Sequence, residues 1–395
     1  MKKIIVRTSV IAAVVAMAVC VIAFCSCSAQ KNTEDKFQFV DIFAGASNIG
    51  HTSPSVGHPL SMCKVGPQSG NESWYYCSGY QFNDTDIYGF TQTRLNGTGR
   101  TDFGDLLMFP YCGDNKLDQV ATANKAATYK EKNAIFKSSY KKENQIGEPG
   151  FYSVYLDDAK VKAEMSAMPH TSLQRYTFDN PSEAKLMIDF QSGITRKEGV
   201  IEERVLEAEQ NFVDSTHITG FAKTKVWLER TWYYEIEFDH PYTDNVKLDL
   251  RDSREKAPRH VLSFDIPEGE SLNVKVSISK ESIDGAKKNI KSEISDWDLE
   301  KVKNSAQKGW RDILNTIDVE GTDIQKEKFY SAMYRLFLHP DNIADVDQAD
   351  NYSTLSLWDT YRSAHPLYTI IKPDVVDKFV NSMLDQFDEV GHLPV

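Results

Sequence analysis

Cysteine is scarce in this sequence of 395 residues and is absent after residue 112. Three of the six cysteines lie within the first 27 residues, and the others are Cys63, Cys77 and Cys112. None of their spacings matches a zinc-binding motif, so a cysteine-ligated zinc centre is not expected. An exported protein can form one disulfide from such a set, and Cys63 with Cys77 is the pair we expect.

Signatures of several common enzyme classes are also missing. There is no G-x-S-x-G turn, no H-E-x-x-H helix and no glycine-rich nucleotide fingerprint after a strand. No repeat of fixed length is visible, which argues against propellers and solenoids. Basic residues are fewer than acidic ones, with 45 Lys and Arg against 57 Asp and Glu, which gives a net charge of -12. Such an acidic chain disfavours nucleic acid as a partner and leaves neutral ligands and cations open.

The first residues are typical of an export signal. A basic start precedes an apolar run from residue 9 to residue 24, and small residues with cysteines follow. Ser26 and Cys27 resemble a bacterial lipoprotein box, so we expect residues 1–27 to be a lipoprotein signal peptide with lipid attached to Cys27. The protein would then be exported and held on a membrane by its lipid, in the periplasm or at the cell surface. A single membrane-spanning anchor is the alternative, because the run approaches spanning length.

Residues 36–280 carry short apolar or alternating runs separated by Gly, Pro, Asn and Asp. Such runs are typical of strands in a sheet that is buried on one face or both. The expected strands are residues 150–156, 161–168, 172–178, 184–190, 216–224, 231–238, 259–266 and 271–279. So many strands between turn signals predict a large antiparallel β-sandwich as the N-terminal domain.

After residue 280 the apolar residues recur every three or four positions, which predicts helices. Residues 281–320 are expected to form a helical linker of one long or two stacked helices. The helices expected after it lie in residues 323–340, 353–365 and 373–391, and the first of them stops before Pro340. Ser353 would cap the second of these, and Pro366 would end or kink it. The residues that the third should bury are Val376, Phe379, Val380, Met383, Leu384 and Phe387.

The predicted fold class is therefore multi-domain β + α. An antiparallel β-sandwich is followed by the helical linker, and residues 321–395 form the start of a helical barrel. Three helices and a linker make a poor closed helical domain. We therefore expect this sequence to be a fragment of a longer protein or the product of an early-terminated gene.

Residues 356–367, "SLWDTYRSAHPL", contain the side chains that a carbohydrate site needs. On a helix Trp358 and Arg362 lie along one line, with Asp359 three residues before Arg362. A flat aromatic ring can cover the C–H face of a sugar, while charged groups bind its neighbouring hydroxyls. The alternative is an internal Asp359–Arg362 ion pair beside a Trp358 in the core.

Two loops of the expected sandwich are further candidates. The glycine-rich segment 89–110 carries Arg94 and Asp102 among its polar residues, and a plain hairpin turn is the alternative. The Gly-, Ser- and Pro-rich segment 45–62 holds His51, for which we expect a structural or substrate-lining role and not a metal site.

Residues 341–352 crowd four aspartates into a connection between helices. Oxygen-rich loops can bind calcium, but the calcium-loop pattern with its central Gly and final Glu is missing here. We expect a solvated turn.

Taken in order, these segments resemble the family-92 glycoside hydrolases, which are exo-acting, calcium-dependent α-mannosidases. Residues 50–62 resemble the family's G-H-T-x-P motif, and residues 89–110 resemble its G-F-S-H-T-H-L-S-G-T-G motif. Residues 356–367 resemble its S-L-W-D-T-Y-R…H-P-L motif, which is the most specific of the three. The resemblance runs from about residue 38 to the end. The chain departs from the family pattern at Ser61, Gln92, Arg94, Pro169 and His170.

The resemblance implies a β-sandwich docked on an (α/α)6 barrel, with the active site at their junction. Asp359 would hydrogen-bond the hydroxyls of a terminal mannose, with Trp358 packed alongside. Arg362 and His365 would support them or hold the helix end. The loop from Arg94 to Asp102, together with His51 of the first motif, would reach in from the sandwich.

The function that this resemblance implies is an inverting, calcium-dependent exo-α-mannosidase of the α-1,2 type, which removes terminal mannose from glycans. The family's general acid, general base and most of its calcium ligands lie beyond residue 395, so no catalytic or metal residue is assigned. A non-catalytic glycan-binding lipoprotein is the alternative. Another enzyme built from a sandwich and a helical barrel, such as a polysaccharide lyase or a phosphorylase, is a third candidate.

Overall fold

The computed structural model describes residues 35–123, 134–195, 204–227, 229–248, 256–353 and 356–394. The chain divides into two units, Met1–Gln38 and Phe39–Val395, and the second contains both large sheets and the helices that follow them. The expected signal peptide and Cys27 lie outside the described residues. Among the described helices, none is long and apolar enough to cross a membrane.

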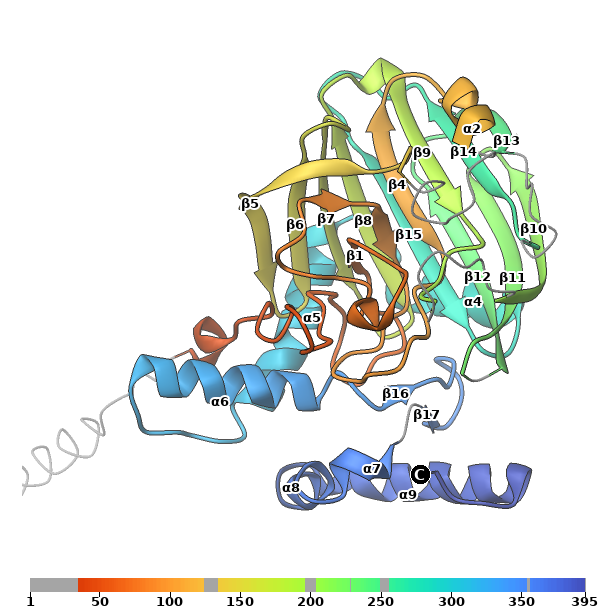
Figure 1. The fold of residues 1–395 in the computed structure, drawn as a ribbon. Coiled ribbons are helices and arrows are strands. Elements are labelled where there is room, and N and C mark those ends of the chain that lie inside the picture. The colour runs from red at the N-terminus through yellow and green to blue at the C-terminus, as the bar shows by residue number, and fades with distance from the viewer. Residues whose placement is uncertain are drawn as a thin grey trace, which may run out of the picture. The chain divides into compact units, whose positions relative to one another are not determined.

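Two antiparallel sheets form a β-sandwich (Figure 1). The larger sheet has the order β10 (Val205–Asp214), β11 (His217–Lys225), β12 (Glu229–Phe238), β15 (Leu272–Ser279), β8 (Thr171–Phe178), β7 (Val161–Ala167), β6 (Phe151–Leu156), β5 (Ser138–Glu148) and β2 (Asp86–Ile87). The smaller sheet has the order β1 (Gly66–Gln68), β3 (Gly89–Thr91), β4 (Leu107–Cys112), β9 (Ala184–Asp189), β14 (Arg259–Phe264) and β13 (Tyr242–Leu248). All eight strands expected between residues 150 and 279 are present, which confirms the predicted sandwich.

Alternating side chains explain why the two sheets pack together. Every second residue of β12 points to the same face, and those that are buried are Trp232, Tyr234, Ile236 and Phe238. The ring of Tyr234 stacks on Phe190 at 5.6 Å between centroids, and Phe238 meets Phe264 of the smaller sheet at 5.4 Å. Burying each such side chain stabilises the fold by about 1.5–3 kcal/mol.

The linker consists of two helices, α4 (Ile283–Glu293) and α5 (Leu299–Leu314), which cover the other face of the larger sheet (Figure 1). Ser282 caps α4 by accepting a hydrogen bond from the Gly285 amide, and Asp298 caps α5 in the same way. The helices bury an apolar cluster against β6 and β8, formed by Phe151, Leu173, Ile294, Leu299 and Val302. The alternative with two stacked helices is therefore the correct one.

The next helix, α6 (Asp323–Leu336), begins with a capping box between Thr322 and Gln325. The expected helix over residues 353–365 is wrong. Ser353 lies instead in a short hairpin of β16 (Asp341–Asn342) and β17 (Tyr352–Ser353), followed by α7 (Leu357–Thr360) and α8 (Ala364–Ile371). Pro366 lies in the first turn of α8, where its missing amide hydrogen removes no helical hydrogen bond, so it helps to start a helix there.

The last helix, α9 (Pro373–Val390), begins at a proline and ends at Gly391 with a positive φ of 79°, as predicted. Its burial differs from the expectation. Of the six apolar residues expected inside, Phe379 is buried, whereas Val380, Leu384 and Phe387 are 47%, 52% and 45% exposed. Tyr352 of β17 and Tyr368 of α8 pack on the Phe379 ring. These two tyrosines do not cover the face of the helix that carries Leu384.

The expected disulfide is also wrong, because Cys63, Cys77 and Cys112 are all free thiols. The backbone amide of Cys63 donates to the carbonyl of Pro169 at 2.9 Å, whereas the Cys77 thiol donates to the carbonyl of Trp74 at 2.9 Å. The two cysteines are therefore held against different segments of the sandwich.

Candidate functional site

An exposed tryptophan lies against a buried histidine on the loops that precede β2. Trp74 begins a short 3-10 helix (Trp74–Tyr76) and is 46% exposed. The ring of His51 meets it edge to face, with 4.3 Å between centroids. Burial lowers the pKa of His51, and neither ring nitrogen has a hydrogen-bond partner among the described residues. A neutral imidazole beside an accessible aromatic face can bind a sugar ring through stacking and a hydroxyl contact.

The loop between β3 and β4 holds this pair in place. The two strands pair antiparallel at Phe90 and Met108, so the hairpin interpretation of residues 89–110 is confirmed. The Gly97 amide donates to the His51 carbonyl at 2.8 Å, and the Trp74 indole N–H donates to the Gly99 carbonyl at 3.0 Å. The tip of the hairpin therefore supports both members of the candidate site.

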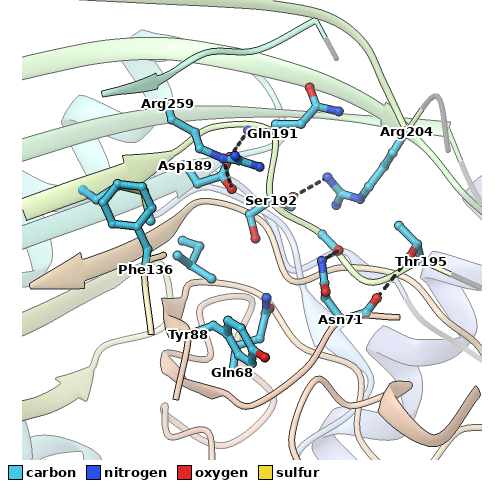
Figure 2. A pocket seen from close by; sticks show the side chains of 13 residues that line it. Gln68, Asn71, Tyr88, Phe136, Asp189, Gln191, Ser192, Thr195, Arg204 and Arg259 are labelled. Atoms are coloured by element: carbon cyan, nitrogen blue, oxygen red, sulfur yellow. Dashed lines mark hydrogen bonds and ion pairs between the residues drawn. The ribbon is translucent and has the colours of Figure 1, made fainter. Parts of the chain in front are cut away.

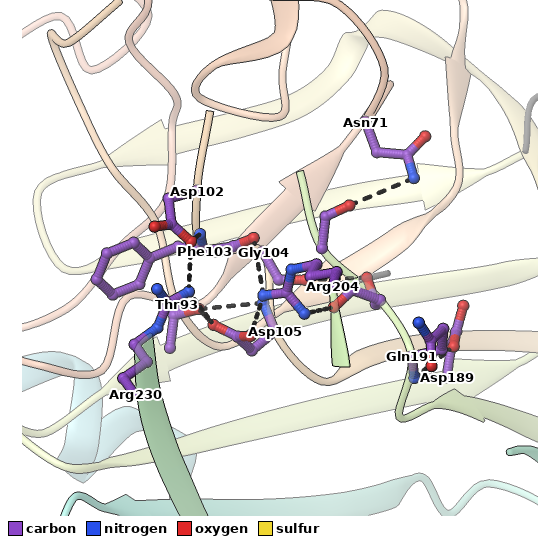
Figure 3. Close-up of polar contacts among 12 residues, drawn as sticks. Asn71, Thr93, Asp102, Phe103, Gly104, Asp105, Asp189, Gln191, Arg204 and Arg230 are labelled. Carbon is purple, nitrogen blue, oxygen red and sulfur yellow. Dashed lines mark hydrogen bonds and ion pairs between the residues drawn. The ribbon is translucent and has the colours of Figure 1, made fainter. Parts of the chain in front are cut away.

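A buried ionic network fixes the base of the same loop (Figure 3). Arg230 pairs with Asp102 at 2.7 Å, and Arg204 pairs with Asp105, which also accepts a hydrogen bond from the Thr93 hydroxyl at 2.5 Å. Burial alone would raise the pKa of Asp105, but the two guanidinium groups lower it to about 2. Asp105 thus stays ionised, and the two ion pairs tie the base of the loop to Arg204 and Arg230.

Arg94 is enclosed behind the candidate site. Its guanidinium donates to the carbonyls of Ser78 and Pro67 at 3.1 Å each. A Cβ atom at Gly79 would lie 1.6 Å from this guanidinium, so only glycine fits that turn. These contacts give Arg94 and Asp102 a supporting role in the loop, and direct contact of either residue with sugar stays a prediction.

The helical part presents a second aromatic side chain. Trp358 of α7 is 74% exposed, so the alternative of a core tryptophan is wrong. Arg362 is exposed, and its Nε donates to the Tyr361 hydroxyl at 2.8 Å. His365 packs edge to face on Tyr368, with 5.7 Å between centroids, and burial lowers its pKa. The side chain of Asp359 lies outside the described part of the structure, so its predicted role stays a prediction.

The end of α6 clamps the sandwich loops to the helical part. The imidazole of His339 accepts a hydrogen bond from the Asn96 amide at 3.1 Å, and Arg335 donates to the Ser53 carbonyl at 3.1 Å. The Leu60 amide donates to the Phe337 carbonyl at 2.7 Å. Segments 45–62 and 89–110, singled out from the sequence, therefore meet at the junction between the sandwich and the helices.

The acidic segment 341–352 is not the solvated turn that we expected. Asp341 is buried and pairs with Lys64, and Asp345 is buried and accepts hydrogen bonds from Ser279 and Asn289 at 2.8 Å each. The remaining two aspartates pair with lysines. Because cations and donors of the protein occupy all four carboxylates, this segment does not fit a calcium ion.

A separate small pocket lies beside the smaller sheet (Figure 2). Its wall includes Gln68, Asn71 and Tyr88, and two of its charged groups pair with each other, since Arg259 donates to Asp189 at 2.9 Å. A third charged group, Arg204, belongs to the loop network described above. This pocket is therefore a weaker candidate than the surface around Trp74.

The sequence analysis missed Trp74. Its surroundings, "NESWYYCSGY" at residues 71–80, contain three consecutive aromatic residues and a fourth at Tyr80 among polar or small residues. Consecutive aromatic residues within an expected loop are the signal that could have identified it.

Comparison with known proteins finds relatives that are described as alpha-mannosidases or glycosidases. A family-92 alpha-mannosidase from Bacteroides thetaiotaomicron has 27% sequence identity, and the match covers 92% of this chain and 51% of that chain with a TM-score of 0.82. The same enzyme in complex with mannoimidazole also gives a TM-score of 0.82, with 92% and 50% covered. An uncharacterized secreted glycosidase from Arthroderma benhamiae is 26% identical over 91% of this chain and 46% of its own length.

The chain thus spans about half the length of the relatives that it matches. Residues 39–279 match the glycosyl hydrolase family 92 N-terminal domain, and residues 285–395 match the glycosyl hydrolase family 92 catalytic domain. The first match contains every strand of the sandwich, and the second contains helices α5 to α9. This chain therefore belongs to glycosyl hydrolase family 92.

Proposed function

We propose that this chain supplies the sandwich and first helices of an exo-acting α-mannosidase that removes terminal mannose from glycans. The observation that carries the proposal is the pair formed by exposed Trp74 and His51, whose ring nitrogens have no hydrogen-bond partner among the described residues. The pair lies on loops that contact the end of α6. A relative with 27% identity is an alpha-mannosidase.

The finer proposal is an inverting, calcium-dependent enzyme of the α-1,2 type. Inversion needs two carboxyl groups about 6.5–9.5 Å apart with a water between them. We assign neither carboxyl group to a described residue, and segment 341–352 does not supply the calcium ligands. Trp358, Asp359, Arg362 and His365 remain the proposed sugar-binding residues of the helical part.

The test is an assay of mannose release by the full-length protein from α-1,2-, α-1,3- and α-1,6-linked mannobiosides, with and without a calcium chelator. Proton NMR of the first product identifies the anomer, and the proposal expects β-mannose to appear first from the α-1,2 substrate. Trp358→Ala should lower kcat/KM, whereas Ile370→Ala, another exposed apolar residue nearby, should not. Release of the retained α-anomer, or release unaffected by the chelator, would overturn the finer proposal.

Glycan binding without catalysis is the second candidate. It is favoured by the fact that Trp74, His51 and Gly99 all belong to the sandwich, which can present a binding face by itself. Calorimetry with mannose and mannobiose separates the two candidates. Affinity without turnover supports the binding module, whereas turnover supports the hydrolase.

We also propose export and attachment to a membrane through a lipid on Cys27. The support is the sequence around Ser26 and Cys27. Metabolic labelling with palmitate should mark the native protein and leave the Cys27→Ala variant unlabelled. Labelling that persists in the variant would overturn this proposal.

A further inference from the structure

Three potential metal ligands converge on the face of the larger sheet that α4 covers. Glu235 and Glu237 are two residues apart on β12, so their side chains point to the same face. His217 of β11 lies directly opposite Glu237 in the ladder. One ligand atom from each residue lies within 4.8 Å of the others. Among the described residues, no other group of three His, Cys, Asp or Glu side chains brings its ligand atoms this close together.

Glu235 is the unusual member of the group. It is only 4% exposed, and its Oε2 has no hydrogen-bond partner among the described residues. A buried carboxylate oxygen without a donor carries a large desolvation cost. Burial raises the pKa of Glu235 to about 7, which reflects the same lack of compensation. A cation between Glu235, Glu237 and His217 would remove this cost.

The histidine is already oriented for metal binding. Its Nδ1 lies 3.0 Å from Oδ1 of Asp214 and 2.9 Å from the Thr216 hydroxyl. A metal-ligating histidine usually donates its second ring N–H to a carboxylate in this way, which fixes the tautomer and makes the other nitrogen a better ligand. Nε2 of His217 is therefore the atom available to a metal.

The charges around the site favour a cation. Three carboxylates, those of Asp214, Glu235 and Glu237, face two ammonium groups. Lys275 of β15 pairs with Glu237 at 3.3 Å and also packs over the Trp297 ring, and Lys287 of α4 acts on Glu235 across the helix–sheet interface. The carboxyl groups therefore outnumber the ammonium groups, and Lys275 contacts one of the three ligands, Glu237.

We propose that His217, Glu235 and Glu237 form a binding site for a divalent transition metal, with Zn²⁺ as the best-suited ion. One imidazole and two carboxylates suit zinc or a neighbouring first-row ion better than calcium, which prefers six to eight oxygen ligands. The ion would tie β11 to β12 near the turn that joins β10 and β11. The site lies outside the loops of the proposed sugar site, and it does not rest on the α-mannosidase proposal.

To bind zinc, the three ligand atoms must move slightly closer to one another. Ligands of a tetrahedral zinc ion at about 2.1 Å lie roughly 3.4 Å from one another, closer than the 4.8 Å limit seen here. His217 and Glu237 are partly exposed, so their side chains can turn inward without disturbing the core. The buried Glu235 provides the fixed position.

The experiment is calorimetric titration of Zn²⁺ into the metal-stripped 395-residue chain. We expect one tight site, and we expect His217→Gln or Glu237→Gln to weaken it by more than about 100-fold, since even second-shell changes cost 10–100-fold. Asp214→Asn, which removes the orienting carboxylate, should weaken it by about 10-fold. His240→Gln is the matched control, because His240 also contacts two carboxylates but lies outside the group.

Circular dichroism confirms that each variant is folded, and X-ray absorption at the zinc edge counts the ligands. One nitrogen and two carboxylates in the first shell support the site. Equal affinity of the wild-type chain and His217→Gln would overturn the proposal. It would also be overturned if binding were lost only after alkylation of the cysteines of the chain, because the zinc would then be held elsewhere.

Discussion

His170 and Glu293 form a buried pair that joins the turn between β7 and β8 to the last residue of α4. Oε1 of Glu293 lies 2.6 Å from Nδ1 of His170, and Oε2 accepts a hydrogen bond from the His170 amide at 3.1 Å. Nε2 of His170 lies 2.6 Å from the carbonyl of Ala344. Both ring nitrogens thus face acceptors, an arrangement that only a protonated imidazole satisfies.

This pair predicts that the stability of the protein depends on pH. Burial alone would lower the pKa of His170, but the hydrogen bond and charge of Glu293 and the Ala344 carbonyl raise it overall. A pKa above the unfolded value of about 6.5 stabilises the folded state below that pH, and the gain is lost as the pH rises through the folded pKa. His170→Gln should therefore lower the free energy of unfolding by about 3 kcal/mol at pH 5.5, and by less at pH 9.

Guanidinium unfolding of the wild-type chain and His170→Gln at both pH values measures this difference. His240→Gln serves as a control, because that histidine lies in a more exposed ion pair with Glu270. A His170→Gln effect that does not change with pH would mean that His170 is neutral in the folded protein.

The sequence predicted eight strands that have a buried face, and the strands it missed include three whose side chains are largely exposed or half-buried. The long strand β5, "SSYKKENQIGE", and the strands β10 and β13 at the ends of the two sheets were not expected. Their side chains are largely exposed or half-buried, so no period of two appears in their hydrophobicity. Edge strands are defined by their neighbours in space, which a single sequence does not contain.

The sequence predicted the segments of the candidate site but not which of their residues are exposed, since exposure also depends on neighbours in space. The motifs indicated segments 45–62 and 89–110, and both lie at the junction with α6. Whether a polar residue supports a loop or faces a ligand depends on burial, and Arg94 is enclosed while Trp74 is accessible. His170, one of the positions at which the chain departs from the family pattern, has a structural role through its buried pair with Glu293.

Trp74→Ala should weaken the function of the sugar site without unfolding the protein. Loss of a stacking ring at the centre of a binding surface typically costs 1–2 kcal/mol, so we expect at least about a tenfold loss in mannose affinity or kcat/KM. The melting temperature should change little, because the side chain is half exposed. Ile146→Ala, at a position equally exposed on β5, is the control for surface truncation. Unchanged affinity in Trp74→Ala would remove this residue from the site.

The buried ion pair between Lys64 and Asp341 should be costly to break from one side. Both side chains are almost fully buried, and Nδ1 of His339 lies 2.8 Å from the same carboxylate. Asp341→Asn leaves the Lys64 charge without its counter-ion, so we expect a loss of about 3–5 kcal/mol in the free energy of unfolding. The double variant Lys64→Met, Asp341→Asn should regain part of this loss, because no buried charge remains.

A double-mutant cycle by chemical unfolding measures the coupling between the two residues. The exposed pair Lys308–Asp312 on α5 provides the comparison, and Asp312→Asn should cost less than about 0.5 kcal/mol. If the double variant were no more stable than Asp341→Asn alone, Lys64 would not be charged in the folded protein.

The outer side of α9 should make the isolated chain associate with itself. Val380, Leu384 and Phe387 recur at four and three residues, so they form one apolar stripe on the helix, and each is about half exposed. Leu384→Lys with Phe387→Lys should shift the protein toward monomer in light scattering across a concentration series. Asp385→Lys is the matched control, since it changes the net charge by the same two units and leaves the stripe intact. If the control and the double variant restored the monomer equally, net charge and not the apolar stripe would govern association. A wild-type chain that is monomeric at every concentration would contradict the prediction altogether.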